Sequence, residues 1–191
     1  MRSMTVALEH PGPWTAEDVL AMPEDPTHAR YEVIDGGLIV TPAPGFPHQR
    51  ASFRLHVLLA EAAQAAGADV EVIENVNVLL PAGLTVPDVV VVDAEVARRA
   101  GAAVDASAVR AVVEIVSPST QRMDRLVKPG VYAEAGIPVL WRVELEPVPA
   151  VIVSELRDGR YVESAVARAG QPATIPVPFP VKLDPRDLVL V

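Results

Sequence analysis

Two valine-rich runs of strand length constrain the fold of this chain most, because each carries an acidic residue. The first run, residues 86–93, contains Asp88 directly after a proline, and the second, residues 109–116, contains Glu114. β-Branched apolar runs of this length are typical of buried strands. An ionised carboxylate in a packed strand costs free energy unless it pairs with a cation or binds a metal ion. Both acids therefore require a partner.

The identity of that partner has two interpretations. If the two strands are neighbours, Asp88 and Glu114 repel each other, and a divalent ion between them would relieve the repulsion. Oxygen ligands alone favour a hard ion such as Mg²⁺ or Mn²⁺. In the alternative, Asp88 ends a turn after Pro87, and Glu114 forms a salt bridge with an arginine at the edge of a sheet. The two runs alone do not decide between these interpretations.

The segment before the first run predicts a hairpin over residues 31–41. Gly36 and Gly37 provide a tight turn between two apolar stretches, which is the usual signal for such a hairpin. Glu32 lies in the first strand, facing the opposite side from its neighbours. It is either an ordinary exposed strand residue or an outer member of the acidic site.

A proline-rich loop follows and leads to a helix over residues 48–66. His48 then lies at the start of the helix, where backbone N–H groups and the helix dipole favour anions. Residues 70–80 alternate as a strand. Within it, Glu74 either turns outward at a bulge or points into the site.

A second helix is expected over residues 120–135, after the Glu114 strand. Pro129 lies inside this helix, which predicts a kink or an interrupted first turn near Lys128. Arg122, Arg125 and Lys128 lie three residues apart and are expected to form one basic ridge. Of the 16 basic residues only two are lysines. A retained lysine suggests the role of a compact charge, which arginine fills badly.

Composition excludes several classes of protein. The 191 residues are 50% hydrophobic, so a folded domain with a sizeable core is expected. There is no cysteine, hence no disulfide and no cysteine-ligated zinc, which is compatible with the cytoplasm. No apolar run approaches the length of a membrane span. The net charge of -9 argues against a protein that coats nucleic acid generally, although it does not exclude a nuclease.

The chain is expected to form one domain. Residues 1–13 look like a loose leader without the features of a signal peptide. Residues 14–191 form the domain, and its C-terminal part, residues 150–191, combines a hairpin with a proline-rich tail. Asp158 and Gly159 supply the turn of that hairpin.

Several motifs resemble known nucleases. A Pro-Asp strand, followed by an acidic residue on a second strand and then by a basic residue, resembles the PD-(D/E)XK nuclease superfamily. The chain is more closely similar to the Uma-two family of restriction-endonuclease-like proteins, over roughly residues 14–145. The residues that carry this resemblance are Tyr31, Glu32, Gly36, Pro47, His48, Pro87, Asp88, the stretch from Glu114 to Thr120, Asp124, Lys128, Tyr132, Gly136, Ile137, Pro138 and Trp141.

The resemblance implies both a fold and an activity. The fold would be an α/β restriction-endonuclease-like domain, with a mixed central sheet, flanking helices and a C-terminal β-hairpin extension. The activity would be hydrolysis of phosphodiester bonds in DNA, dependent on Mg²⁺ or Mn²⁺. Asp88 and Glu114 would hold the metal ion, and Glu32 would complete the acidic shell.

One departure concerns the lysine of the superfamily, which follows the acidic residue by two positions and is replaced here by Val116. In the Uma-two pattern the lysine of the next helix takes that role, which implies that Lys128 is the catalytic lysine. His48, Arg122 and Arg125 would be possible substrate-binding residues.

Two further expectations concern the oligomeric state of the protein and whether it is an enzyme. The resemblance and the apolar C-terminal hairpin suggest a two-fold homodimer, which is the commonest closed arrangement. The rival to an enzyme is a non-catalytic binding or assembly module that keeps the nuclease fold, because fold alone does not fix function.

Overall fold

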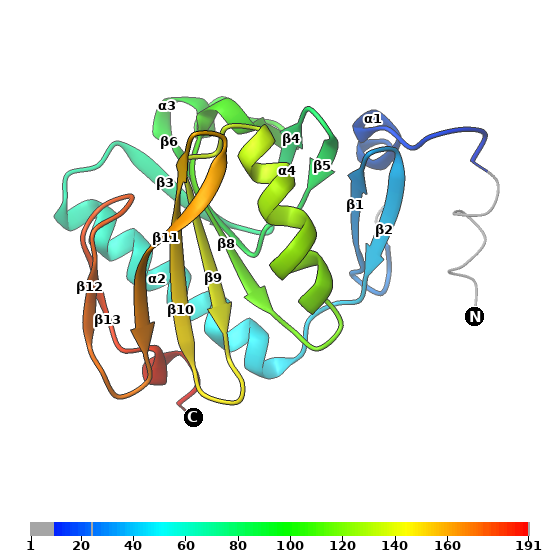
Figure 1. Cartoon of the computed structure of the whole chain (residues 1–191). Helices are drawn as coiled ribbons and strands as arrows, with labels where there is room; N and C mark the ends of the chain where they lie inside the picture. Colours follow the sequence, from blue (N-terminus) through cyan, green and yellow to red (C-terminus); the bar gives the residue numbers. More distant parts are fainter. Residues whose placement is uncertain (1–9, 24, 191) are drawn as a thin grey trace.

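The computed structural model describes residues 10–23 and 25–190. Its centre is a six-stranded sheet with the strand order β11-β10-β9-β8-β6-β3 (Figure 1). β8 and β9 run parallel, and the other neighbouring pairs of this sheet are antiparallel, so the predicted mixed sheet is confirmed. The strands are β3 (Val70–Glu74), β6 (Val89–Asp93), β8 (Val109–Val116), β9 (Val139–Glu144), β10 (Ala150–Arg157) and β11 (Arg160–Arg168).

The two acidic runs form β6 and β8, which lie side by side at the centre of this sheet. Successive strand residues point to opposite faces. Val89 and Val91 therefore pack with helix α2 (Phe46–Ala65), whereas Val90 and Val92 pack with helix α4 (Lys128–Glu134). Both faces are covered, which explains why the runs are apolar at every position instead of alternating.

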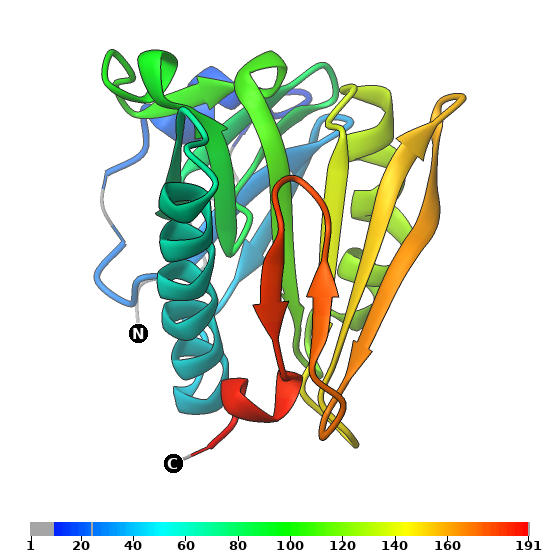
Figure 2. The same cartoon turned by 90° about the vertical axis from the view of Figure 1, so that its left-hand side faces the viewer.

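Figure 2 shows α2 on the near face of the sheet, beside the C-terminal strands, with α4 behind. The predicted hairpin is β10 and β11, and it continues the central sheet to its edge. The proline-rich tail turns back over the α2 face, where its apolar side chains join the larger core cluster. Its elements are β12 (Ala173–Ile175), β13 (Val181–Leu183) and the short 3-10 helix η4 (Pro185–Leu188).

A second, smaller sheet has the order β2-β1-β5-β4-β7 and packs against the α4 face. The predicted hairpin at its edge is confirmed, since β1 pairs with β2 around Gly36. Its strands are β1 (Arg30–Ile34), β2 (Gly37–Thr41), β4 (Asn77–Leu80), β5 (Gly83–Thr85) and β7 (Ala103–Asp105).

The strand predicted over residues 70–80 is divided between the two sheets. Asn75 has a positive φ of 55° and breaks the run, so β3 belongs to the central sheet and β4 to the smaller one. Glu74 neither turns outward at a bulge near Ile73 nor points into the site. Its carboxylate accepts a hydrogen bond from the Ser52 hydroxyl of α2 at 2.5 Å.

Four short helices complete the fold of the described residues, and the first of them has a capped N-terminus. Thr15 and Asp18 form a reciprocal capping box on the first helix, as the sequence spacing suggests. The expected leader falls mainly on residues 1–9, which lie outside the described residues. No helix in the described ranges is both long and apolar enough to cross a membrane. The helices are α1 (Ala16–Leu20), α3 (Ala94–Ala97), the 3-10 helix η2 (Ala106–Ala108) and η3 (Met123–Val127).

A single glycine fixes the pairing of β1 with β5, which gives a first prediction. Gly83 pairs with Ile34 at a φ of +137°, and a Cβ there would overlap the carbonyl oxygen of Val33. We expect Gly83→Ala to lower the free energy of unfolding by about 2 kcal/mol or more, measured by urea denaturation. Gly101→Ala, where no atom lies within 4 Å, is the control. Equal denaturation midpoints for the two variants would contradict this assignment of strain.

Candidate active site

Asp88 and Glu114 lie together at one end of the β6–β8 pair. Val89 pairs with Val113 in the antiparallel register, so Asp88 and Glu114 come next on their strands, on the face that α4 covers. Each residue is only 2% exposed. The two strands are neighbours, which is the condition under which Asp88 and Glu114 lie close together, and the two acids are buried side by side.

An irregular helix start brings Lys128 to these acids. η3 is a π-helical turn, in which the N–H of Lys128 donates to the carbonyl of Met123, and Pro129 follows at the start of α4. A proline is tolerated at this position because its missing N–H has no helical partner there. The predicted interruption near Lys128 is therefore present. Such π-turns are found frequently at functional sites.

The Lys128 ammonium is the common partner of three carboxylates. Its Nζ lies 3.0 Å from Oε1 of Glu114, 3.0 Å from Oε1 of Glu32 and 3.8 Å from Oδ1 of Asp124. The Tyr132 hydroxyl, one helical turn further on, also donates to Oε1 of Glu114. Lys128 is 5% exposed, so this cation is held inside the protein.

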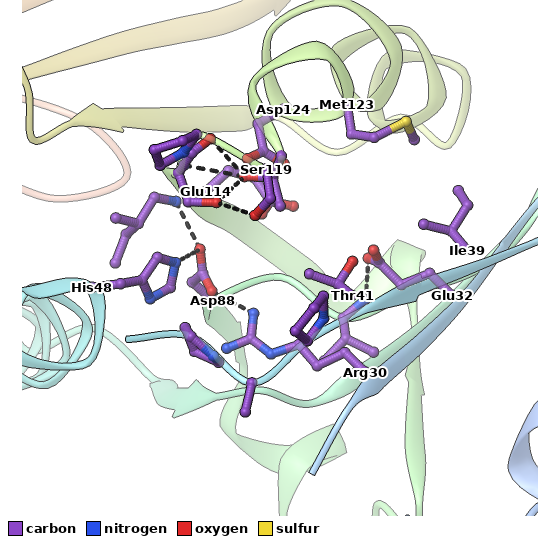
Figure 3. A pocket seen from close by; sticks show the side chains of 18 of the residues that line it. Arg30, Glu32, Ile39, Thr41, His48, Asp88, Glu114, Ser119, Met123 and Asp124 are labelled. Carbon is purple, nitrogen blue, oxygen red and sulfur yellow. Dashed lines mark hydrogen bonds and ion pairs between the residues drawn. The ribbon is translucent and has the colours of Figure 1, made fainter. Parts of the chain in front are cut away.

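Glu32 reaches the site from β1. It is 4% exposed, and its Oε1 also accepts a hydrogen bond of 2.8 Å from the backbone N–H of Val86. Arg30 lies two residues earlier on the same strand, and residues two apart on a strand share a face. Both side chains therefore point from the hairpin toward the acids of the central sheet (Figure 3).

Asp88 has partners on three sides. Its Oδ1 pairs with Nη1 of Arg30 at 2.5 Å, and its Oδ2 lies 3.2 Å from Nε2 of His48. Oδ2 also accepts a hydrogen bond of 2.7 Å from the backbone N–H of Ile115. The first turn of α2 thus places His48 against Asp88, and β1 supplies the neutralising arginine.

These side chains line a cavity of about 430 Å³, which we call the first cavity. Figure 3 shows Asp88 and His48 on one side, Arg30 and Glu32 below, and Glu114 and Asp124 above. The remaining wall comes from the proline-rich loop, the end of β2 and the turn after β8. The cavity therefore combines carboxylates with a few fixed cations.

Burial sets the protonation of the acids nearest to Lys128. Burial raises the pKa of Glu114 to about 8; the Lys128 charge lowers it in part, and Asp124, Asp88 and Glu32 raise it further. Burial also raises the pKa of Asp124, although Lys128 and a hydrogen bond from Thr120 oppose the shift. Both acids therefore hold a proton more readily than an exposed carboxyl does, and a bound cation would oppose this shift.

For Asp88 and Lys128, the neighbouring charges outweigh the effect of burial on the pKa. Burial alone would raise the pKa of Asp88, but His48 and Arg30 outweigh that effect and hold it below its usual value. Burial would lower the pKa of Lys128, yet Glu114, Glu32 and Asp124 together raise it. Asp88 is thus a stabilised carboxylate and Lys128 a stabilised ammonium.

The raised pKa of Glu114 predicts a pH-dependent stability without metal. Between about pH 4.5 and pH 8 the unfolded chain releases the Glu114 proton and the folded chain keeps it, so rising pH favours unfolding. We expect Glu114→Gln, measured by thermal unfolding in EDTA, to gain stability relative to the parent across this window. If the difference between the two proteins stays constant from pH 5 to pH 8, the Glu114 carboxyl is not held protonated.

The donor set fits a hard divalent cation in its chemistry. Four carboxylates reach one cavity, and oxygen donors are the ligands that Mg²⁺ and Mn²⁺ prefer. In the rotamers present, however, no three His, Asp or Glu side chains of residues 10–23 and 25–190 are arranged around one metal position. Their oxygens instead contact Arg30, His48 and Lys128. Asp88 and Glu114 would hold an ion here.

The structure does not join Arg122 and Arg125 to this cavity. Both are exposed, whereas Lys128 is buried, so the predicted basic ridge is wrong. Arg125 instead binds Glu144 through two hydrogen bonds of 3.0 and 2.7 Å. The π-turn contains more residues than an α-helical turn, so residues three apart no longer share a face.

Two charged residues of the cavity were not singled out as site residues from the sequence. Arg30 shares its strand face with Glu32, and Asp124 precedes Lys128 by four residues, the spacing that aligns side chains on a helix. Arg30 can be recognised from the sequence only after Glu32 has been assigned to the site. Asp124 likewise depends on the assignment of Lys128.

Comparison with known proteins identifies a family and places the chain among solved structures of similar fold. The family model Uma2, described as "Putative restriction endonuclease", matches residues 16–188. A crystal structure of a putative nuclease belonging to DUF820 from Anabaena variabilis ATCC 29413 is 20% identical, with a TM-score of 0.69. The match covers 93% of this chain and 98% of that one, and it bears out the restriction-endonuclease-like α/β fold. No curated protein matches the chain.

Proposed function

Because the chain belongs to the Uma2 family of putative restriction endonucleases, we propose that it is a nuclease that hydrolyses phosphodiester bonds in DNA with the help of Mg²⁺ or Mn²⁺. The observation that carries the proposal is the first cavity, where buried acids from two neighbouring strands meet one buried lysine. Asp88 and Glu114 are the proposed metal ligands, and Glu32 and Lys128 complete the catalytic set.

The charges of the first cavity support one divalent ion. Its four carboxylates are Glu32, Asp88, Glu114 and Asp124, and its two permanent cations are Arg30 and Lys128. The excess of two negative charges equals the charge of one Mg²⁺ or Mn²⁺. This excess adds to the effect of burial on the pKa of Glu114, because the charges of Asp124, Asp88 and Glu32 raise that pKa further.

The chain's own residues have distinct roles in the proposed hydrolysis. A bound ion would supply an activated water and offset the charge that builds on the phosphate. Lys128 holds Glu114 and Glu32 in place and presents a fixed positive charge to the reacting group. Arg30 uses one N–H on Asp88, and its guanidinium has further donors that can bind a phosphate oxygen. Water adds across one P–O bond and leaves a phosphate monoester and a hydroxyl group.

A plasmid assay tests the proposal. Purified protein is incubated with supercoiled DNA in Mg²⁺, in Mn²⁺ and in EDTA, and nicked and linear products are separated on a gel. We expect products with either ion and none in EDTA. Binding of Mg²⁺ without cleavage of any DNA, or cleavage that persists in EDTA, would argue against a metal-dependent nuclease. No binding at millimolar ion would favour a non-catalytic module that keeps the fold.

We further propose a homodimer formed through β11. This strand is last in the order of the central sheet, and its Val162 and Val166 are 37% and 42% exposed. Unpaired edge strands readily pair with a second copy, and a two-fold axis closes such an assembly. We expect sedimentation at micromolar concentration to give twice the chain mass of 20.3 kDa, and Val166→Lys to give the monomer. A parent protein that sediments as a monomer would remove this proposal.

A further inference from the structure

A second cavity, of about 250 Å³, adjoins the first one. The two cavities share four lining residues, which are Gly45, His48, Ser117 and Pro118. In a nucleic acid, the base lies one sugar away from its phosphate. A DNA strand with its scissile phosphate in the first cavity would therefore bring an adjacent base to the second.

The walls of the second cavity suit a flat, heteroaromatic ring. Pro47, Val116 and Leu145 contribute apolar surface. A polar edge is formed by Gln121, Arg125 and Glu144, which are linked to one another. Nη1 of Arg125 donates to the Gln121 amide oxygen at 3.2 Å, and its Nη2 donates to Glu144 at 2.7 Å. Apolar faces beside fixed donors and acceptors are the features by which proteins hold an unstacked base.

Phe46 is an aromatic residue that adjoins the second cavity along the chain. It lies between Gly45 and Pro47, which both line the second cavity, and it is the first residue of α2. With 88% of its surface exposed, it is the most exposed large apolar side chain in the described part of the chain. It therefore adds little to the stability of the fold, and its ring is accessible to a ligand.

The negative charge of the chain also favours a contribution to DNA binding from the bases. The chain has a net charge of -9, Lys128 is buried among carboxylates, and Arg30 is engaged with Asp88. Sequence-independent affinity for DNA comes mainly from cations that contact phosphates. Stacking of a base on an aromatic side chain contributes about 1–3 kcal/mol, and it does not depend on charge.

We propose that the second cavity is a nucleobase subsite, in which an unstacked base next to the scissile phosphate is held against Phe46. This inference rests on the proposed nuclease function and narrows its substrate to DNA with unpaired nucleotides. A base inside an intact duplex is stacked on both sides, so it must leave the helix before it can enter the subsite. Phe46 is then a residue that positions substrate and sets its specificity.

Binding of single-stranded DNA tests the subsite separately from cleavage. The probes are a fluorescein-labelled oligothymidine and an abasic chain of the same length, which keeps the phosphates and lacks the bases. Binding is measured in Ca²⁺, which offers the same charge to oxygen ligands, and cleavage is measured in Mg²⁺ and Mn²⁺. The variants are Phe46→Ala, Phe46→Trp and the matched control Phe53→Ala, which alters another exposed phenylalanine seven residues along α2 (62% exposed).

We expect the parent to bind oligothymidine about 10- to 100-fold more tightly than the abasic chain. Phe46→Ala should lose this preference without a change in melting temperature. Phe46→Trp should keep it, with a change in tryptophan fluorescence that appears with oligothymidine and not with the abasic chain. Phe53→Ala should bind like the parent.

Different outcomes would contradict the nucleobase subsite and the nuclease function. Equal binding of the two probes by the parent, no binding of either, or an unchanged preference in Phe46→Ala overturns the subsite, even if DNA is cleaved. A Phe46-dependent preference without cleavage in Mg²⁺ or Mn²⁺ overturns the nuclease function and leaves the subsite standing. If Phe46→Ala and Phe53→Ala both weaken binding and halve the sedimenting mass, the exposed side of α2 is an interface between copies, and the subsite is wrong.

Discussion

Asp88→Asn and Glu114→Gln are each expected to lower Mg²⁺-dependent DNA cleavage on the order of 10³-fold. Each substitution keeps the size of the side chain and removes one negative charge from the pair of proposed metal ligands. Calorimetric titration of Mg²⁺ should show weakened binding in both variants. Initial rates of plasmid nicking, measured beside the parent protein, give the loss of activity. Parental metal affinity in both variants would show that these carboxylates are not the ligands.

Without metal, the two variants should differ in stability, although the loss of repulsion between the two acids would by itself leave either fold intact or stabilised. Asp88 has a lowered pKa because His48 and Arg30 favour its charged form, so Asp88→Asn should destabilise the protein at neutral pH. Glu114 has a raised pKa, so Glu114→Gln should stabilise it there. Thermal unfolding at pH 7.5 in EDTA separates the two cases. Melting temperatures that shift in the same direction would contradict this distribution of charge.

Lys128→Arg is expected to lose about 100-fold or more in turnover while metal affinity stays nearly unchanged. The single Nζ of Lys128 lies 3.0 Å from both Glu32 and Glu114. An arginine keeps the charge, but its wide, planar guanidinium cannot place one nitrogen between the same two oxygens. Single-turnover cleavage in saturating Mg²⁺ measures this loss directly.

Two further variants serve as comparisons for the turnover of Lys128→Arg. Lys128→Ala should lose at least as much turnover, and it should also unfold more easily, because it leaves buried carboxylates without their cation. Lys182→Arg, at an exposed position of β13, should cleave like the parent. Parental turnover in Lys128→Arg would reduce Lys128 to a structural cation.

Much of the architecture follows from local patterns in the sequence. The glycine pair at residues 36 and 37 indicates the β1–β2 hairpin, and the two valine runs indicate the buried strands β6 and β8. Pro129 indicates an interrupted helix, which η3 provides. These signals are local, because each depends on φ restriction, side-chain periodicity or a missing N–H.

The parts that sequence reasoning did not find depend on distant contacts. Arg30 looks like any residue at the start of a strand until β1 is placed opposite β6, which brings it to Asp88 across 58 residues. The division of the strand over residues 70–80 depends on Asn75, whose positive φ leaves no mark on the apolar alternation. Arg122 and Arg125 were assigned with α-helical spacing, and the π-turn removes that register.

The central claim is that Asp88 and Glu114 hold one divalent cation in the first cavity. Anomalous scattering from crystals soaked in Mn²⁺ tests it most directly. We predict one anomalous peak in the cavity, within coordination distance of both carboxylates, and no such peak in Glu114→Gln crystals. Anomalous density only at other positions, or an empty cavity at millimolar Mn²⁺ with Arg30 and Lys128 still in contact with the acids, would contradict the claim.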